Sequence, residues 1–256
     1  ISYKNAKTKL EKAEVNAIQF MHYMAISELD TAIKTGKEGL RLCGIDFPEK
    51  DLAEIIIKES ALLDDLLKNR EIASLINAPA MTDEAHMVAM RIFPNLAIGG
   101  YISGQTELFT LCSLISTRIS LQFGQLDLSA YIYAWYGLLL SQQMRYEEAY
   151  EFGRLAIKLA DRYKNCREES QLYNVIGIFL THIRRPLKES IPILSKGYHI
   201  GLQMGDNISA IYCIHNVGVQ MFASGERLGK MVQHTDKLTE LSYKHKVLNC
   251  GDINVI

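Results

Sequence analysis

The residue types best suited to metal binding and nucleophilic catalysis occur in this chain but are scattered along it. No two histidines lie three or four positions apart, as a helical His-Glu-x-x-His zinc motif requires; they are His22, His86, His182, His199, His215, His234 and His245. The cysteines form no Cys-x-x-Cys pair and lie singly at Cys43, Cys112, Cys166, Cys213 and Cys250. The sequence therefore predicts no metal site and no disulfide framework.

The chain also lacks the motifs of common catalytic centres. It contains no Gly-x-x-x-x-Gly-Lys-Ser/Thr phosphate loop, no His-Arg-Asp loop and no Gly-x-Ser-x-Gly elbow. Gly99, Gly100 and Gly104 lack the spacing of a dinucleotide fingerprint and follow no predicted strand, so we expect a helix stop and a turn there. We predict no catalytic residue and no cofactor, with an uncharacterised helical enzyme as the alternative.

One pair of basic residues stands at the end of a predicted helix. Arg184 and Arg185 come directly before Pro186, which favours a helix end. Because cations are stabilised at the negative end of the helix dipole, a structural role is predicted for the pair. Anion recognition is the alternative.

Composition limits the class of protein. The 256 residues include 28 Lys and Arg against 29 Asp and Glu, so the net charge of −1 argues against a general nucleic-acid binder. The longest apolar stretch, Ile132–Leu140, is far too short to cross a bilayer, and no membrane association is predicted. The unpaired cysteines favour a reducing cytoplasm. The chain does not begin with Met, and we expect it to be a piece of a longer multidomain protein.

Apolar residues recur at intervals of three and four almost from end to end, which indicates helices. Only 5 residues are Pro, and no segment shows the alternation of apolar and polar residues that a strand would have. Breakers at regular intervals separate the predicted helices 7–27, 29–43, 50–68, 83–98, 106–123, 128–143, 146–163, 167–184, 187–204, 207–224 and 227–245.

A period of about forty residues connects the later helices. Gly137, Gly177 and Gly218 occupy equivalent points of three helices, where a missing side chain would let a second helix cross closely. Ala149, Gly153 and Ala156 form a ladder of small residues in a returning helix. This pattern is typical of tetratricopeptide-like (TPR-like) hairpins, although small residues also occur at crossings in other helical proteins. We predict an all-α, right-handed α-solenoid forming a single domain over residues 1–256, less regular over 49–125 and clearer over 128–245.

In such a stack, the first helix of each hairpin lines the concave face. Alternate members of the aromatic group around Tyr133 and Trp135 should then face opposite sides. The residues predicted to line this face are aromatic, amide, hydroxyl and imidazole side chains, namely Tyr131, Gln142, Gln171, Asn174, Thr181, His182, Tyr212, His215 and Phe222. Such a lining suits a protein or peptide segment. A neighbouring domain of the same polypeptide is the alternative occupant.

Several stretches, in this order and spacing, resemble the helical region of large bacterial signalling proteins that contain protein-kinase-like, STAND-type AAA-like ATPase, GAF and histidine-kinase domains. They are residues Gly39–Pro48, Ala80–Asp83, Ala134–Gly137, Tyr146–Ala160, His182–Ser190 and Gly197–Asp206. The resemblance implies a noncatalytic regulatory arm that couples a nucleotide switch to an output module in cytoplasmic signal transduction. A stand-alone TPR-type peptide receptor or transcription-regulator domain is the alternative function.

Overall fold

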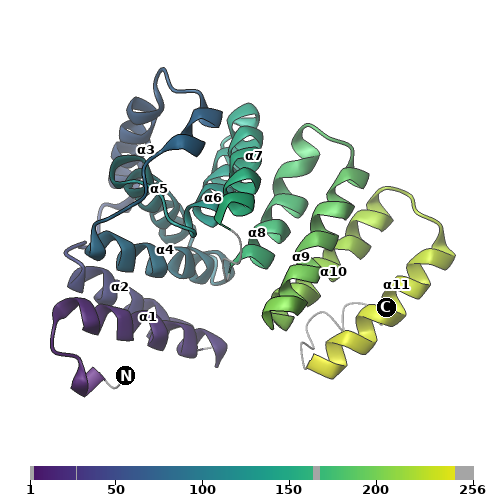
Figure 1. Cartoon of the computed structure of the whole chain (residues 1–256), viewed down its shortest axis with the longest axis horizontal. Helices are drawn as coiled ribbons and strands as arrows, with labels where there is room; N and C mark the ends of the chain where they lie inside the picture. The colour runs from purple at the N-terminus through teal and green to yellow at the C-terminus, as the bar shows by residue number, and fades with distance from the viewer. Residues whose placement is uncertain (1–2, 27, 164–167, 246–256) are drawn as a thin grey trace. The chain divides into compact units, whose positions relative to one another are not determined.

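The computed structural model of the chain describes residues 3–26, 28–163 and 168–245, and these residues are helical apart from turns and one isolated bridge between Ala80 and Gln125 (Figure 1). The prediction of an all-α chain is confirmed. The α-helices are α1 (Lys9–Ala25), α2 (Leu29–Leu42), α3 (Leu52–Leu67), α4 (Glu84–Ile102), α5 (Thr106–Phe123), α6 (Ser129–Gln142), α7 (Tyr146–Tyr163), α8 (Glu169–Val175), α9 (Ser190–Met204), α10 (Asn207–Ala223) and α11 (Leu228–His245).

The chain divides into two compact units, Ile1–Ile132 and Tyr133–Ile256, so that α6 contributes to both. In unit 1, α1 packs against α2, both pack against α4, and α5 packs against α4 and α3. A capping box starts α1: the Thr8 hydroxyl accepts a hydrogen bond from the backbone N–H of Glu11, and the Glu11 carboxylate accepts one from the backbone N–H of Thr8. Small residues permit the closest crossings: a Cβ added to Gly39 would lie 2.7 Å from Ile92 Cδ1 of α4.

The expected helix stop at Gly99 and Gly100 is wrong. Helix α4 continues through both glycines to Ile102, and the turn follows at Gly104, whose φ of +71° favours glycine. A Cβ on Gly100 would lie 2.7 Å from the backbone nitrogen of Phe109, so this glycine permits close approach of α5. A six-residue 3₁₀ helix, Ile72–Asn77, was also absent from the prediction.

In unit 2, α8 packs against α9, α9 against α10, and α10 against both α8 and α11. The three equivalent glycines lie where neighbouring helices approach. A Cβ added to Gly137 would lie 3.1 Å from the carbonyl oxygen of Ala149, one on Gly177 would lie 2.6 Å from Leu194, and one on Gly218 would lie 3.0 Å from the ring of His234. The prediction that these glycines make room for a crossing helix is confirmed.

The predicted helix 167–184 changes its winding along its length. After α8, residues Ile176–Leu180 form a π-helical segment, and Thr181–Ile183 tighten into a 3₁₀ turn. The carbonyl oxygen of Ile176 accepts hydrogen bonds from both the backbone N–H and the hydroxyl of Thr181, which stabilises the wider turn. A second 3₁₀ turn, Leu187–Glu189, precedes α9 after Pro186.

Helix α6 is apolar on all sides, and every side chain from Leu128 to Leu140 is buried. Such a helix has no polar face to place in water. The sequence pattern allowed some members of its aromatic group to line a groove; that is wrong, because Tyr131, Tyr133, Trp135 and Tyr136 are all buried. The rings of Tyr133 and Tyr136 pack against Phe152 of α7 at 5.5 and 4.9 Å between centroids.

Tight turns between helices contain left-handed residues. Gly44, Gly104, Gly205 and Gly225 adopt positive φ angles after α2, α4, α9 and α10. The turn between α6 and α7 instead places Met144 at φ = 61°. A side chain in this conformation is disfavoured by contact with its own backbone, so this turn is strained.

Candidate functional site

Helix α10 presents a line of exposed apolar residues, which we call the α10 stripe. Its members are Ile208, Tyr212, Val219 and Phe222, whose successive spacings of four, seven and three residues place them on one helical face. They are exposed by 60, 39, 43 and 75%, respectively. The opposite face of α10 is buried against α9 and α11 through a cluster that includes Ile211, Ile214 and Leu238. Helix α10 is thus anchored on one side and apolar on its exposed side.

Two helices of unit 2 are joined by an amide pair beside this stripe. The Asn216 Nδ2 group of α10 donates to Oδ1 of Asn174 in α8 over 2.8 Å. Both side chains are half-buried. The bond fixes the register between α8 and α10, the two helices that sequence reasoning placed on one face.

His215 lies within the span of the stripe but is half-buried. Burial, and secondly the neighbouring His234, lower the pKa of His215 below its ordinary value. The His234 Nε2 atom lies 2.8 Å from the carbonyl oxygen of Ile214, so α11 is held to α10 by a side-chain contact to the backbone. The neutral form of His215 is therefore favoured next to the apolar side chains.

The structure sorts the predicted concave-face residues into four groups. Tyr212 and Phe222 are exposed on the α10 stripe, with His215 between them. Gln171 and Asn174 are half-buried on α8, and Gln142 and His182 are exposed elsewhere. Tyr131 and Thr181 are buried, which corrects their predicted placement on an open face. Tyr131 belongs to the segment of α6 that is buried on all sides, and the hydroxyl of Thr181 donates to the Ile176 carbonyl.

Sequence reasoning missed a pocket of about 300 Å³ in unit 2. It lies among α7, the π-helical segment and the start of α9, and its lining residues are Tyr150, Gly153, Arg154, Ile157, Ile176, Leu180, Thr181, Arg185, Glu189 and Ile193. The sequence pattern had singled out three of these residues for other reasons: Gly153 in the ladder of small residues, Thr181 as a predicted concave-face residue, and Arg185 as a helix-end cation with anion recognition as the alternative. The pocket has no repeat signature, because a change of winding brings its residues together.

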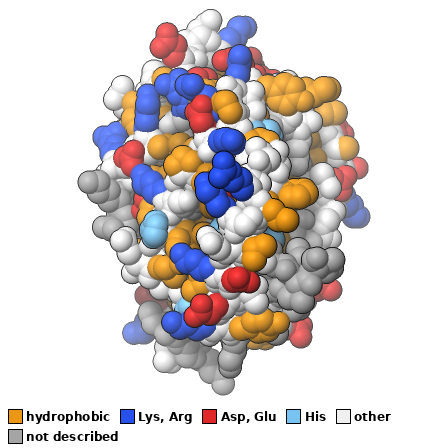
Figure 2. All heavy atoms as spheres, turned by 90° about the vertical axis from the view of Figure 1, so that its right-hand side faces the viewer, with side chains coloured by type: hydrophobic (Ala, Val, Ile, Leu, Met, Phe, Trp, Pro, Cys, Tyr) orange, Lys and Arg blue, Asp and Glu red, His pale blue; other side chains and the backbone are white. Residues whose placement is uncertain are grey.

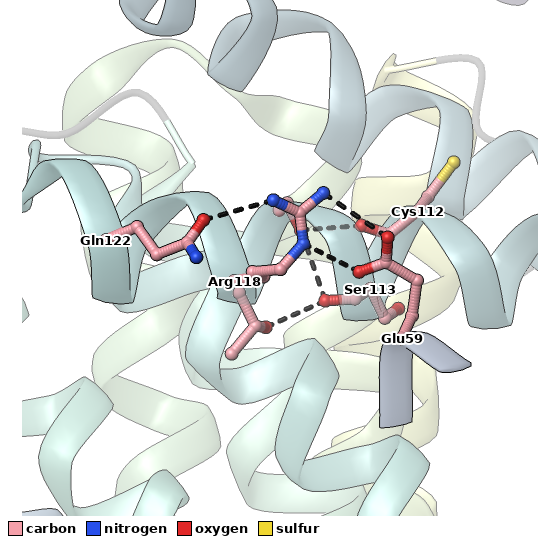
Figure 3. Close-up of polar contacts among 7 residues, drawn as sticks. Glu59, Cys112, Ser113, Arg118 and Gln122 are labelled. Carbon is pink, nitrogen blue, oxygen red and sulfur yellow. Dashed lines mark hydrogen bonds and ion pairs between the residues drawn. The ribbon is translucent and has the colours of Figure 1, made fainter. Parts of the chain in front are cut away.

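Unit 1 contains a partly buried ion pair between α3 and α5. Arg118 donates from Nε to Glu59 Oε2 over 2.7 Å and from Nη2 to Oε1 over 3.3 Å, and its Nη1 group donates to Gln122 (Figure 3). Earlier in α5, the hydroxyls of Ser113 and Thr117 each donate to the carbonyl four residues before them. The polar side chains of Arg118, Ser113 and Thr117 therefore all have hydrogen-bond partners on this largely buried helix, and we assign these residues a structural role.

The described cysteines are unsuited to nucleophilic chemistry. Burial raises the pKa of the Cys43 thiol to about 11 and that of Cys213 to about 12, and burial also raises the pKa of Cys112. The reactive thiolate is therefore scarce at neutral pH. Cys166 and Cys250 lie outside the described residues.

The surface chemistry of the described residues is mixed. On the side where α11 is drawn in Figure 1, hydrophobic side chains reach the surface in separate groups between basic and acidic ones (Figure 2). Within the described ranges, no three His, Cys, Asp or Glu side chains gather as metal ligands would. None of the helices in those ranges combines the length and apolar character needed to span a bilayer.

Comparison with known proteins gives no family assignment. No protein-family model matches the chain, and no curated protein matches it significantly.

Proposed function

We propose that the chain is a noncatalytic interaction domain whose second unit is a short, right-handed TPR-like solenoid. Its α10 stripe would bind an amphipathic helical segment of a protein partner. The exposed apolar face of α10 is the observation on which this proposal depends. The close helix crossings at Gly137, Gly177 and Gly218 support the repeat architecture, because each lies at the same point of a successive hairpin.

The dimensions and chemistry of the stripe favour a helix as the bound segment. From Ile208 to Phe222 a helix rises about 21 Å, at about 1.5 Å per residue, which matches roughly four turns of a partner helix. The stripe holds two aromatic residues and no charged one, and aromatic residues are enriched at the centres of protein interfaces. A partner with apolar side chains at intervals of three and four could cover all four positions at once.

The role of this binding within a larger protein follows from the sequence resemblance. In a cytoplasmic signalling ATPase or kinase, the bound segment would belong to a neighbouring domain, and the contact would couple a nucleotide switch to an output module. Deleting the helical region should then leave nucleotide hydrolysis intact and abolish its coupling to output. Coupling that survives the deletion would contradict the regulatory role.

The binding proposal can be tested with the full chain and a displayed library of random linear peptides. We expect the selected peptides to have apolar or aromatic residues at intervals of three and four. Phe222→Ser should weaken their binding about tenfold or more, because a large exposed anchor is lost.

Ile57→Ser is the matched control, since Ile57 is an exposed apolar residue of α3 in unit 1. Its peptide affinity should equal that of the unsubstituted chain. Selected peptides that bind Phe222→Ser as tightly as the original chain would overturn the assignment of the stripe, as would equal weakening by Ile57→Ser.

A further inference from the structure

The pocket beside the π-helical segment has the size and construction of a small-ligand site. Its volume of about 300 Å³ is at the lower end of the range of about 300–1,000 Å³ typical of ligand pockets. All of its lining residues belong to unit 2, and none belongs to the α10 stripe. It is therefore a second site that stands independently of the proposed protein-binding surface.

The inner part of the pocket is apolar. Gly153 of α7 and Ile176 and Leu180 of the π-helical segment are buried, and Ile157 and Ile193 are partly buried beside them. Gly153 leaves this side of α7 without a side chain, where a Cβ would lie 3.1 Å from Leu180 Cδ1. The interior thus suits a compact hydrocarbon or aromatic body.

The π-helical winding is part of the construction. It brings Ile176, Leu180 and Thr181 to the lining, and the hydroxyl of Thr181 is used in donating 2.9 Å to the Ile176 carbonyl. Single π turns inside helices occur frequently at functional sites, where the local cost of poorer backbone geometry is offset by function. The polar part of a ligand must therefore be recognised by other residues.

The remaining polar residues of the lining are Tyr150, Arg154, Arg185 and Glu189. Arg185 donates from Nε to the Tyr150 hydroxyl over 3.2 Å, and its closest atom to Glu189 is 3.9 Å from that carboxylate. Arg154 donates from Nη1 to Glu151 over 3.1 Å. Within the described residues, the hydrogen bonds of Arg185 use Nε alone, which leaves its Nη groups for a planar oxyanion.

We propose that this pocket binds a small organic carboxylate with an apolar body, the body lying against Ile157, Ile176 and Ile193 and the carboxylate on Arg185. Arg154 is paired with Glu151, whereas the Nη groups of Arg185 donate to none of the described residues, so Arg185 favours an anion over a cation of the same shape. A neutral compound of that shape would fill the interior but would form no charge-assisted hydrogen bond with Arg185.

The test uses the full chain titrated with three probes of one shape: phenylpropionate, phenylpropylamine and phenylpropanol. Binding is followed by calorimetry and by methyl NMR signals of the lining isoleucines. We expect phenylpropionate to bind saturably and to shift those signals. The alcohol should bind about tenfold more weakly or worse, and the amine more weakly still.

Three substitutions make the test specific. Arg185→Gln should weaken phenylpropionate binding about tenfold or more, because a charge-assisted bond is lost. Glu189→Gln should strengthen it several-fold, because a competing carboxylate is removed. Arg184→Gln is the matched control, since Arg184 is similarly exposed and pairs with Glu147 but does not line the pocket, and it should leave binding unchanged.

The Glu189→Gln gain also guards against misfolding, because a damaged fold would not bind more tightly. The proposal is overturned if none of the probes binds, if the amine binds as well as the acid, or if Arg184→Gln weakens binding as much as Arg185→Gln. It is also overturned if binding leaves the signals of Ile157, Ile176 and Ile193 unmoved.

Discussion

Replacing Gly177 by alanine should destabilise unit 2, although alanine is the better helix former. A Cβ at this position would lie 2.6 Å from both Cγ and Cδ2 of Leu194, whereas non-bonded carbons prefer about 3.5–4.0 Å. Leu194 is fully buried, so relief requires α9 to move by about 1 Å. Overpacking of this kind costs about 1–3 kcal/mol, and the alanine regains at most about 1 kcal/mol. Because two atoms of a fully buried side chain are met at 2.6 Å, the upper part of this range, about 2–3 kcal/mol, applies, and a net loss of about 1–2 kcal/mol remains.

Urea unfolding followed by tryptophan fluorescence measures the stability of unit 2, where the substitution lies. Trp135 is the single tryptophan of the chain and is buried in unit 2. Gly229→Ala is the control, since a Cβ at Gly229 in α11 would meet nothing within 4 Å and should stabilise α11 by up to about 1 kcal/mol.

The reasoning is refuted if Gly177→Ala unfolds at the same or a higher urea concentration than the unsubstituted chain. A double-mutant cycle sharpens the result. Leu194→Ala removes the side chain that the new methyl group meets, so the double mutant should be more stable than the sum of the single losses predicts, by about 1 kcal/mol or more. Strict additivity would show that the two residues do not meet.

Four further predictions concern polar and titratable groups. Arg118→Met should lower the free energy of unfolding by about 1–3 kcal/mol, because it leaves the Glu59 carboxylate partly buried and unpaired. Adding Glu59→Leu to this variant should restore stability in the same urea assay, and a further loss would contradict the pairing. Thr181→Val should cost about 0.5–1.5 kcal/mol through the lost bond to the Ile176 carbonyl, and unchanged stability would show that this bond is dispensable. Because the pKa of His215 is lowered in the folded chain, the unfolded chain takes up its proton first, and the free energy of unfolding should fall as pH drops below about 6.5. His234→Gln should raise the pKa of His215 in an NMR titration, and an unmoved value would exclude the influence of His234.

Helix positions could be predicted well because apolar spacing and breakers determine them locally. Gly44, Gly205 and Gly225 follow α2, α9 and α10, which agrees with the predicted helix ends at 43, 204 and 224. Gly99 and Gly100 could not be distinguished from a helix stop, because a glycine that ends a helix and one that admits a neighbouring helix have the same neighbours in sequence. Only the 2.7 Å approach of the Phe109 backbone to Gly100 decides between them.

The candidate sites were predictable only in part. Tyr212 and Phe222, which were predicted to line a concave face, are both exposed on α10, whose other side is buried against α9 and α11. Tyr131 was misplaced because the prediction assumed that one side of this helix is open, whereas every side chain from Leu128 to Leu140 is buried. The pocket depends on the π-helical winding at Ile176–Leu180, and one residue of extra winding leaves no mark on composition or periodicity.

The strained turn at Met144 has a consequence for how unit 2 tolerates change. Met144 is exposed, and its left-handed conformation belongs to a tight turn that the Arg145 N–H closes by donating to the Leu140 carbonyl over 3.0 Å. A longer connection between α6 and α7 would release this strain. The entropy lost in closing a longer loop grows only with the logarithm of its length. This corner is therefore where unit 2 could accept inserted residues, or a grafted module, without disturbing its helices.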